Sequence, residues 1–546
     1  PNKPTLMENI NDAYYELRKM QARVAKGQPI EAGGKDDVIT FLTRAPGAVN
    51  AGVTRAKLIL NSVKKAAPDV NPDDINSIIY INHALEILAQ KGAGRVMAGG
   101  FTTEAELQDA LEEIINRLGG KFQQANDAAG ILTQAYDTEL SRLVDSGLVS
   151  PELATELRTK YPWYNPLDYL SDLEELQMQG KAVKPFDVVS SGLKRLTEQG
   201  TSKDAIAPLN VLGEQLIKNE VRIVKNDTAK AIIDLAQKDR TIAVKKISGV
   251  KPVAQVNGET IFRRTWEDLP GTLSFFEGGK RQIYQVPDFI YREANLLSKI
   301  APHPTASLVG SINGVTRAAF TSASLPFTVT NVFNDMLTAF VNRGILPTQT
   351  ATRLIASLRG LENDTVMQSF RLAGGLQARF YGESGEQIAK DAALRSKVTK
   401  GGKPFLSRVI AASLRPIEAI GELGEQSPRM ALYARQMDKT LPGWRQMPPE
   451  QSAATPQGRK AAADSVELTI NFARGGHLIK ATNPFVIFLN AAFEGTKLPY
   501  RSLRDNSNAR WRLAAVIGGI IVLTAYNLTR KEYMDVPDYQ RWGSII

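Results

Sequence analysis

The sequence predicts a mainly α-helical protein of several domains, with one small antiparallel β-hairpin element near residues 242–286. Apolar residues recur at helical spacing through segments of ten to twenty residues, separated by Gly, Pro and capping side chains. Alternating apolar and polar residues typical of strands are concentrated between about Ile242 and Val286. The length of 546 residues exceeds what a single hydrophobic core usually organises, which favours several domains.

The N-terminal region is expected to consist of helices with explicit end signals. They are predicted over Leu6–Lys26, Asp37–Thr43, Val53–Ala67 and Ile75–Lys91, the last capped by Asp73 or Asp74. Thr103-Glu104-Ala105-Glu106 has capping-box spacing, so the next helix begins there and ends at Gly119.

A helical hairpin is expected within Gln134–Lys160. Its first helix ends at Gly147, and Ser150-Pro151-Glu152 begins the second with a capping hydroxyl, a first-turn proline and a favourable carboxylate. The prolines of Tyr161–Leu167 cannot continue that helix, and we expect a domain edge there.

Two hairpins make up the predicted β element. Val253–Val256 and Glu259–Phe262 flank Asn257-Gly258, a dipeptide suited to the positive φ angles of a tight turn. Leu273–Phe276 and Arg281–Val286 flank a second glycine-rich turn at residues 277–280.

Helices are predicted again in the C-terminal half. They cover Phe289–Ile300, Phe327–Arg343, Thr348–Leu358, Ser369–Gly382, Pro404–Arg415, Arg429–Thr440, Arg459–Ala473, Pro484–Arg504 and Trp511–Arg530. Gly401-Gly402 and Pro442–Gly458 are interpreted as flexible connectors. The predicted division is into residues 1–165, 166–300, 301–441 and 442–546.

We find no known catalytic motif in the sequence. There is no Cys, and His83, His303 and His477 are the only histidines, which argues against thiolate chemistry and multi-histidine metal sites. The Gly-Gly-Lys segments lack P-loop spacing, and adjacent carboxylates on helices point in different directions. We therefore predict a non-enzymatic protein without cofactor or metal.

The net charge of +10 favours anionic partners such as nucleic acid or phospholipid. One basic segment without acidic residues contributes the candidate DNA contacts Arg395, Lys397, Lys400, Lys403, Arg408 and Arg415, although a solvated surface has the same composition. Arg501 and Arg504, followed by Arg510 and Arg512, form a second basic strip compatible with lipid or DNA phosphate.

The strip precedes an apolar helix predicted at residues 513–528. Leu513–Tyr526 would be about 21 Å long, short of the roughly 30 Å of a hydrocarbon core, whereas extension to Thr529 reaches the lower limit for spanning. Two interpretations stay open: a buried core helix, or conditional or oligomeric membrane insertion with basic residues at both ends. The candidate membrane contacts are Trp511, Leu513, Val516, Ile517, Ile520, Ile521, Leu523 and Tyr526.

Several C-terminal segments together resemble a known family. They are Glu425–Arg429, Tyr433, Leu468–Gly476, Asn483–Phe485, Phe488–Ala491, Gly495 and Tyr533–Arg541, with weaker agreement in Leu143–Leu167 and Thr330–Asp335. This pattern resembles the C-terminal domain of the large polyvalent proteins of tailed phages and mobile elements. Asn334 stands where the family often has a basic residue.

The resemblance implies a helical internal virion or ejection protein, packaged in the capsid or portal region and delivered with the DNA to the host envelope. Expected partners are portal and internal core proteins, further copies of this chain, DNA and the host membrane, where it could form part of a channel. Two alternatives are a DNA-binding packaging or antirestriction component, and a module of a larger enzyme whose catalytic domain lies elsewhere. Because the sequence starts at Pro1 without a signal-peptide pattern, a processed product or a fragment is a further hypothesis.

Overall fold

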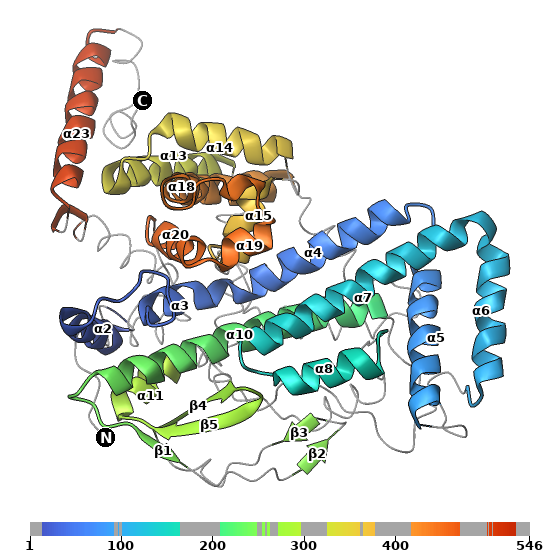
Figure 1. The fold of residues 1–546 in the computed structure, drawn as a ribbon. Helices are drawn as coiled ribbons and strands as arrows, with labels where there is room; N and C mark the ends of the chain where they lie inside the picture. Colours follow the sequence, from blue (N-terminus) through green and yellow to red (C-terminus); the bar gives the residue numbers. More distant parts are fainter. Residues whose placement is uncertain are drawn as a thin grey trace, which may run out of the picture.

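The fold is mainly α-helical with a small antiparallel β element, as predicted. The computed structural model describes residues 12, 14–91, 97, 101–163, 208–247, 254–256, 259–261, 271–295, 325–360, 364–376, 416–469, 500, 502–504 and 506–530. Three long helices, α4 (Ala48–Ala66), α7 (Phe122–Asp145) and α10 (Pro208–Lys238), run diagonally through the middle of the molecule (Figure 1). The remaining elements pack around this central group.

Further helices pack around the central group. They are α2 (Tyr15–Gly27), α3 (Val38–Arg44), η1 (Ala45–Gly47), α5 (Pro72–Lys91), α6 (Glu104–Leu118), η3 (Gly119–Lys121), α8 (Pro151–Lys160) and α11 (Asp288–Asn295). At one end α5 and α6 pack on α7 around buried Ile78, Leu107 and Leu132. At the other end α2 and α3 pack against α10 around Leu17 and Ile232.

The predicted end signals of the N-terminal helices are mostly confirmed. Thr103 Oγ1 accepts from the Glu106 N–H at 3.3 Å, and Glu106 Oε2 accepts from the Thr103 N–H at 3.1 Å. Ser150 Oγ accepts from the Leu153 N–H at 3.2 Å. The predicted Asp73 or Asp74 cap is wrong, because α5 begins at Pro72 and Asn71 Oδ1 accepts from the Asp73 N–H at 3.1 Å.

The β element consists of two separate sheets. One has the order β1-β5-β4, formed by β1 (Lys245–Ile247), β4 (Thr272–Glu277) and β5 (Lys280–Gln285), and all its pairs are antiparallel. The other pairs β2 (Ala254–Val256) with β3 (Glu259–Ile261) across the predicted turn, with Val256 opposite Glu259. Both predicted hairpins are confirmed, and β4 packs against α10.

All three long central helices differ from the prediction. The 31-residue helix α10 was not predicted, and α7 begins at Phe122 rather than near Gln134. Helix α4 begins at Ala48, before the predicted Val53. In α10 the apolar period is interrupted by buried polar residues, among them Asn219, Glu220 and Asn226, which explains why the pattern was missed.

The C-terminal helices form a second layer above α3 and α4 in Figure 1. They are α13 (Leu325–Arg343), α14 (Pro347–Gly360), α15 (Thr365–Leu372), α18 (Pro416–Thr440), η5 (Trp444–Gln446), α19 (Pro449–Ala454) and α20 (Pro456–Val466). Phe370, Tyr433 and Trp444 are buried together, with Tyr433 in edge contact with both other rings. The expectation of a flexible connector at Pro442–Gly458 is therefore wrong, because Trp444 anchors this segment in the core.

Three further helix bounds are corrected by the structure. Helix α15 begins at Thr365, directly after its capping residue Asp364, and ends before Gly374 at φ 79°, well short of the predicted Gly382. Helix α20 begins at Pro456 and ends at Val466, where the prediction ran from Arg459 to Ala473. Helix α18 continues through Pro428 instead of beginning after it. Burial of Met430, Leu432 and Tyr433 in the turns that follow Pro428 offsets the roughly 3 kcal/mol cost of an internal proline.

The last described helix, α23 (Ser507–Asn527), projects away from the C-terminal layer (Figure 1). Its bounds agree with the predicted helix at Trp511–Arg530 to within a few residues. Several predictions lie outside the described residues, namely the helix at Pro404–Arg415, most of Pro484–Arg504, and the terminal segment Tyr533–Ile546.

Candidate functional site

Helix α23 exposes apolar side chains over most of its surface. Trp511 is 78% exposed, and Ile521, Leu523 and Tyr526 are each more than half exposed. Of its 21 residues only Ala509 is buried. Within the part of the chain that the structure describes, Leu513–Tyr526 is therefore not a core helix.

The predicted membrane-contact residues lie on more than one face of α23. Leu513, Val516 and Ile520 are half-buried and share a face by helical spacing, whereas Trp511 and Tyr526 are exposed on the opposite side. Fully burying a side chain of this size contributes about 1.5–3 kcal/mol relative to leaving it in water. Covering the exposed apolar side chains of α23 with lipid or with another protein would therefore contribute favourable binding free energy.

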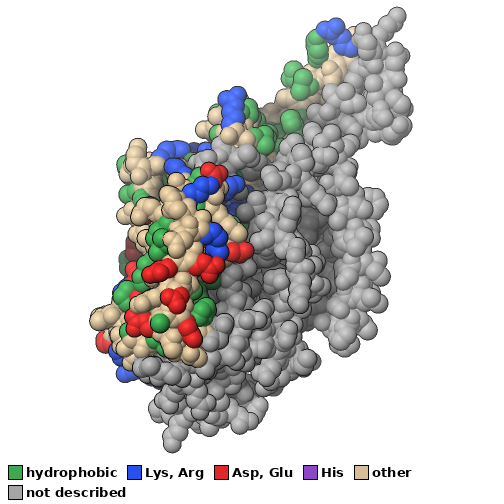
Figure 2. Space-filling model, turned by 90° about the vertical axis from the view of Figure 1, so that its right-hand side faces the viewer, with side chains coloured by type: hydrophobic (Ala, Val, Ile, Leu, Met, Phe, Trp, Pro, Cys, Tyr) green, Lys and Arg blue, Asp and Glu red, His purple; other side chains and the backbone are tan. Residues whose placement is uncertain are grey.

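The space-filling view agrees with this description. The projecting upper part of the molecule in Figure 2 carries hydrophobic side chains between groups of Lys and Arg. By composition and length, α23 is the one helix among the described residues that is apolar enough to cross a membrane. Gly518 and Gly519 face open space, so a second helix could approach there closely.

The first turns of α23 are fixed to the carboxyl end of α13. Asn506 Nδ2 donates to the Asn342 carbonyl at 3.1 Å, and Arg512 Nη1 donates to the Val341 carbonyl at 3.1 Å. Asn506 also caps α23, because its Oδ1 accepts from the Asn508 N–H at 3.0 Å. The helix is therefore held at its base while the apolar part extends outward.

Arginines gather at this base because the carboxyl end of α13 presents free carbonyl groups. Arg435 of α18 donates to the Arg343 carbonyl at 2.7 Å and to the Gly344 carbonyl at 3.1 Å. The partial negative charge of a helix carboxyl end favours cations there. Burial, together with the charges of Arg512 and Arg343, lowers the pKa of Arg435. We call Arg343, Arg435 and Arg512 the root cluster.

The candidate DNA contacts are placed only in part. Arg395, Lys397, Lys400, Lys403, Arg408, Arg415 and Arg501 lie outside the described residues, so their role stays a prediction. Arg504 is exposed in a helical turn just before α23, with its guanidinium 5.9 Å from the Tyr500 ring centroid. It therefore belongs to the basic surroundings of the α23 base.

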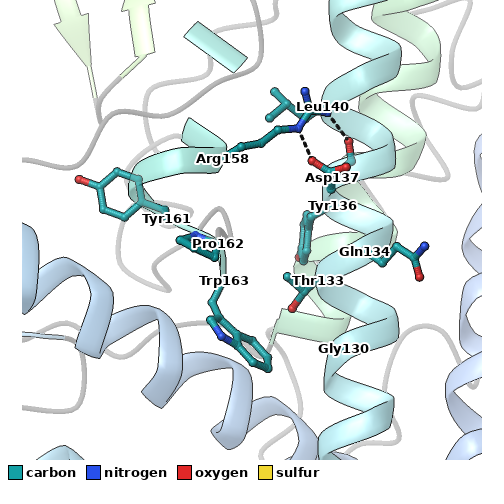
Figure 3. Close-up of a pocket in the computed structure, with 10 residues that line it drawn as sticks. All are labelled: Gly130, Thr133, Gln134, Tyr136, Asp137, Leu140, Arg158, Tyr161, Pro162 and Trp163. Atoms are coloured by element: carbon teal, nitrogen blue, oxygen red, sulfur yellow. Dashed lines mark hydrogen bonds and ion pairs between the residues drawn. The ribbon is translucent and has the colours of Figure 1, made fainter. Parts of the chain in front are cut away.

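A hollow of about 410 Å³ lies between α7 and the segment that follows α8 (Figure 3). Tyr136, Tyr161 and Trp163 supply much of its wall. Its charged groups are paired with one another: Arg158 forms an ion pair with Asp137 and donates to Ser141 Oγ at 2.5 Å. The arrangement suits packing and offers no convergent acid and base among its described lining residues.

A buried charge group joins the three central helices. Arg142 of α7 donates to Glu139 at 2.8 Å and pairs with Glu220 of α10, which also lies 3.8 Å from Arg55 of α4. Burial lowers the pKa of Arg142, but the carboxylates of Glu220 and Glu139 outweigh that effect and raise it. The group holds α4, α7 and α10 together, which is a structural role.

Residues that carry the family resemblance are packed together in the C-terminal layer. Arg429 Nε donates to Thr469 Oγ1 at 2.8 Å in a buried position. Asn342 Nδ2 donates to the neighbouring Leu468 carbonyl at 3.0 Å, which links α13 to the same segment. These residues stabilise the layer that supports α23.

Sequence reasoning identified α23 but missed Arg343 and Arg435. Arg343 and Arg435 lie far before α23 in the sequence. They come to the base of α23 because Arg343 ends α13, and because Arg435 and Arg512 both donate to carbonyl groups at that end of α13. Comparisons with protein-family models, curated proteins and solved structures found no match.

Proposed function

We propose that this chain is a non-enzymatic module of a phage internal virion or ejection protein, which is delivered with the genome and contacts the host membrane through α23. One structural observation carries the proposal: an apolar helix of 21 residues that the fold leaves exposed. The family resemblance supplies the virion context.

The dimensions of α23 suit a lipid bilayer. Twenty-one residues of helix measure about 31 Å, close to the roughly 30 Å of a hydrocarbon core. The wholly uncharged part is shorter, but Arg512 at one end and Arg530 at the other have side chains long enough to reach the interfaces. Trp511 and Tyr526 lie near these ends, at the positions that interfacial aromatic residues occupy.

The virion part of the proposal is tested by quantitative mass spectrometry of purified particles before and after triggered DNA release. We expect peptides of this chain in intact particles and their depletion afterwards. Retention after release would make the chain a fixed virion component, and absence from both samples would remove the virion assignment.

The membrane part is tested by vesicle flotation of the Ile520→Lys variant. Replacing Ile by Lys at the centre of an inserted helix costs about 3–4 kcal/mol, so insertion should weaken about 100- to 1,000-fold. Ile115→Lys is the control, because it places the same substitution at an exposed position of α6, away from α23. Both variants should keep the parent's helicity in solution, and equal insertion by Ile520→Lys would contradict the membrane contact.

A further inference from the structure

We propose that the root cluster binds the headgroups of anionic phospholipids and thereby fixes the end from which α23 meets the membrane. This inference rests on the proposed membrane contact and adds to it a lipid class and an orientation. It concerns residues from three helices, α13, α18 and α23, which no sequence motif connects.

The geometry places the Arg435 and Arg512 guanidinium groups at the carboxyl end of α13, and Arg343, the last residue of that helix, is close enough for its charge to act on Arg435. Arg435 contacts the Arg343 and Gly344 carbonyls, and the Arg512 guanidinium lies so close to Gly344 that an added Cβ there would be 3.0 Å away. Arg343 and Arg435 are exposed, and Arg512 is half-buried. Each guanidinium therefore retains donors that face solvent beside the first apolar turn of α23.

The root cluster also lacks compensating charge. Among the described residues, none of its three arginines forms an ion pair with a carboxylate, although Arg142, Arg353 and Arg445 elsewhere all do. Like charges held close together repel one another, and the lowered pKa of Arg435, caused by burial and by its two neighbours, reflects this. A phosphate group bound between them would relieve the repulsion, and guanidinium groups match phosphate geometry.

A lipid phosphate fits this position better than a free anion or a nucleic acid. Arg512 immediately precedes Leu513, where the apolar part of α23 begins, and Trp511 in the same turn is 78% exposed. Headgroup phosphates lie next to the hydrocarbon region, so one surface can bind both parts of the same lipid. A DNA phosphate backbone would leave the adjacent apolar surface uncovered.

The same arrangement sets an orientation. The root cluster and the folded layer behind it stay at the interface first reached, and the opposite end of α23, with Arg530 stacked on Tyr526, is the end that moves into the bilayer. Three clustered cations at the base are harder to transfer across hydrocarbon than the single described arginine at the tip.

The test compares flotation of the full chain with vesicles of phosphatidylcholine alone and of phosphatidylcholine mixed with phosphatidylglycerol. The wild-type chain should bind the mixed vesicles more tightly. Arg343→Glu/Arg435→Glu should lose that preference, with binding about 10- to 100-fold weaker at low salt. Arg343→Glu alone should act in the same direction, and it removes no side-chain hydrogen bond to the α13 carbonyls.

Two controls separate site binding from a general charge effect. Lys64→Glu/Lys65→Glu changes the net charge equally at exposed positions of α4 and should keep the preference for mixed vesicles. Arg343→Lys/Arg435→Lys retains the charges and should restore most of it. An equal loss with the α4 variant would overturn the site.

The remaining outcomes distinguish this inference from the membrane contact itself. Equal insertion of wild type and variant into both vesicle types would overturn lipid selectivity and leave the membrane contact intact. Absence of any vesicle binding by wild type would refute both. If the root-cluster variant loses duplex DNA binding but keeps its vesicle preference, the arginines serve nucleic acid and the inference is wrong.

Discussion

Asn226 is expected to be one of the most sensitive positions in the fold. It lies in the middle of α10 and is fully buried. Its Oδ1 accepts from the Phe276 N–H at 2.6 Å, and its Nδ2 donates to the Phe276 carbonyl at 3.0 Å and to the Ser146 carbonyl at 2.7 Å. One amide thus joins α10 to the end of β4 and to the loop between α7 and α8.

The magnitude follows from these three bonds. Asn226→Leu has a similar volume but leaves one N–H and two carbonyl groups without a partner, and each such buried group costs about 1–3 kcal/mol. We expect a decrease of about 4 kcal/mol in the free energy of unfolding, because some of the freed groups will reach water. This is a large share of the stability of a typical domain.

The measurement is urea unfolding of the variant, together with hydrogen exchange at the Phe276 amide, which should lose protection. Asn82→Ala is the matched control, since its Nδ2 donates only to the Ile78 carbonyl of its own helix at 2.9 Å in a half-buried position. That change should cost less than about 1 kcal/mol. A loss below 1 kcal/mol for Asn226→Leu, or unchanged exchange at Phe276, would refute the reasoning.

Four further substitutions test other parts of the fold by thermal or urea unfolding. Gly47→Ala should destabilise the protein by about 2–4 kcal/mol, because the added Cβ would lie 2.3 Å from the Gly374 carbonyl oxygen. Gly130 lies inside α7 and faces open space, so Gly130→Ala should stabilise the protein by up to about 1 kcal/mol. Tyr433→Phe should cost about 1–2 kcal/mol, since the buried hydroxyl lies 2.7 Å from that of Ser369; no loss would show that this bond contributes nothing. Burial raises the pKa of Asp227 from 3.8 to about 7, so the native protein binds the extra proton between these values and its stability falls as pH rises through them. Asp227→Asn should flatten that slope and stabilise by about 1–2 kcal/mol at pH 8, and an unchanged pH profile would contradict the assignment.

Helix ends and tight turns could be predicted because their signals are local. Thr103 with Glu106, and Ser150 with its following proline, satisfy neighbouring backbone groups, so a few residues determine each helix start. The turn at Gly278 and Gly279, both with positive φ, follows from glycine alone. These parts of the fold depend little on distant partners.

Helix α10 could not be predicted because its pattern depends on distant partners. Glu220 is buried beside Arg142, and Asn226 is buried against β4, so polar side chains occupy positions that a sequence reader assigns to the exposed face. Pro428 led to a wrong predicted start of α18 for the same reason, because packing of this helix outweighs the local cost of proline. In both cases tertiary contacts overrode the local pattern.

Amino-acid composition alone does not predict whether a helix such as α23 is buried or exposed. Helix α5 has 20 residues and is rich in Ile and Leu, yet Ile75, Ile78 and Ile79 are buried against α6 and α7. Length and a high content of Ile and Leu therefore do not show whether a helix is buried or exposed, because burial depends on which other elements pack against it.

The distribution of side chains around α23 narrows what can cover it. Exposed Trp511, Ile517 and Leu523 are six residues apart in turn, so they point in three different directions around the axis. A single partner helix would bury one stripe and leave the others in water, whereas lipid surrounds a helix on every side. If α23 inserts as we propose, the root cluster at its base would lie beside the headgroup phosphates. The apolar surface and the cationic base are consequences of one arrangement, which is why the Ile520→Lys and Arg343→Glu variants should fail at different steps, the first at insertion and the second at initial binding.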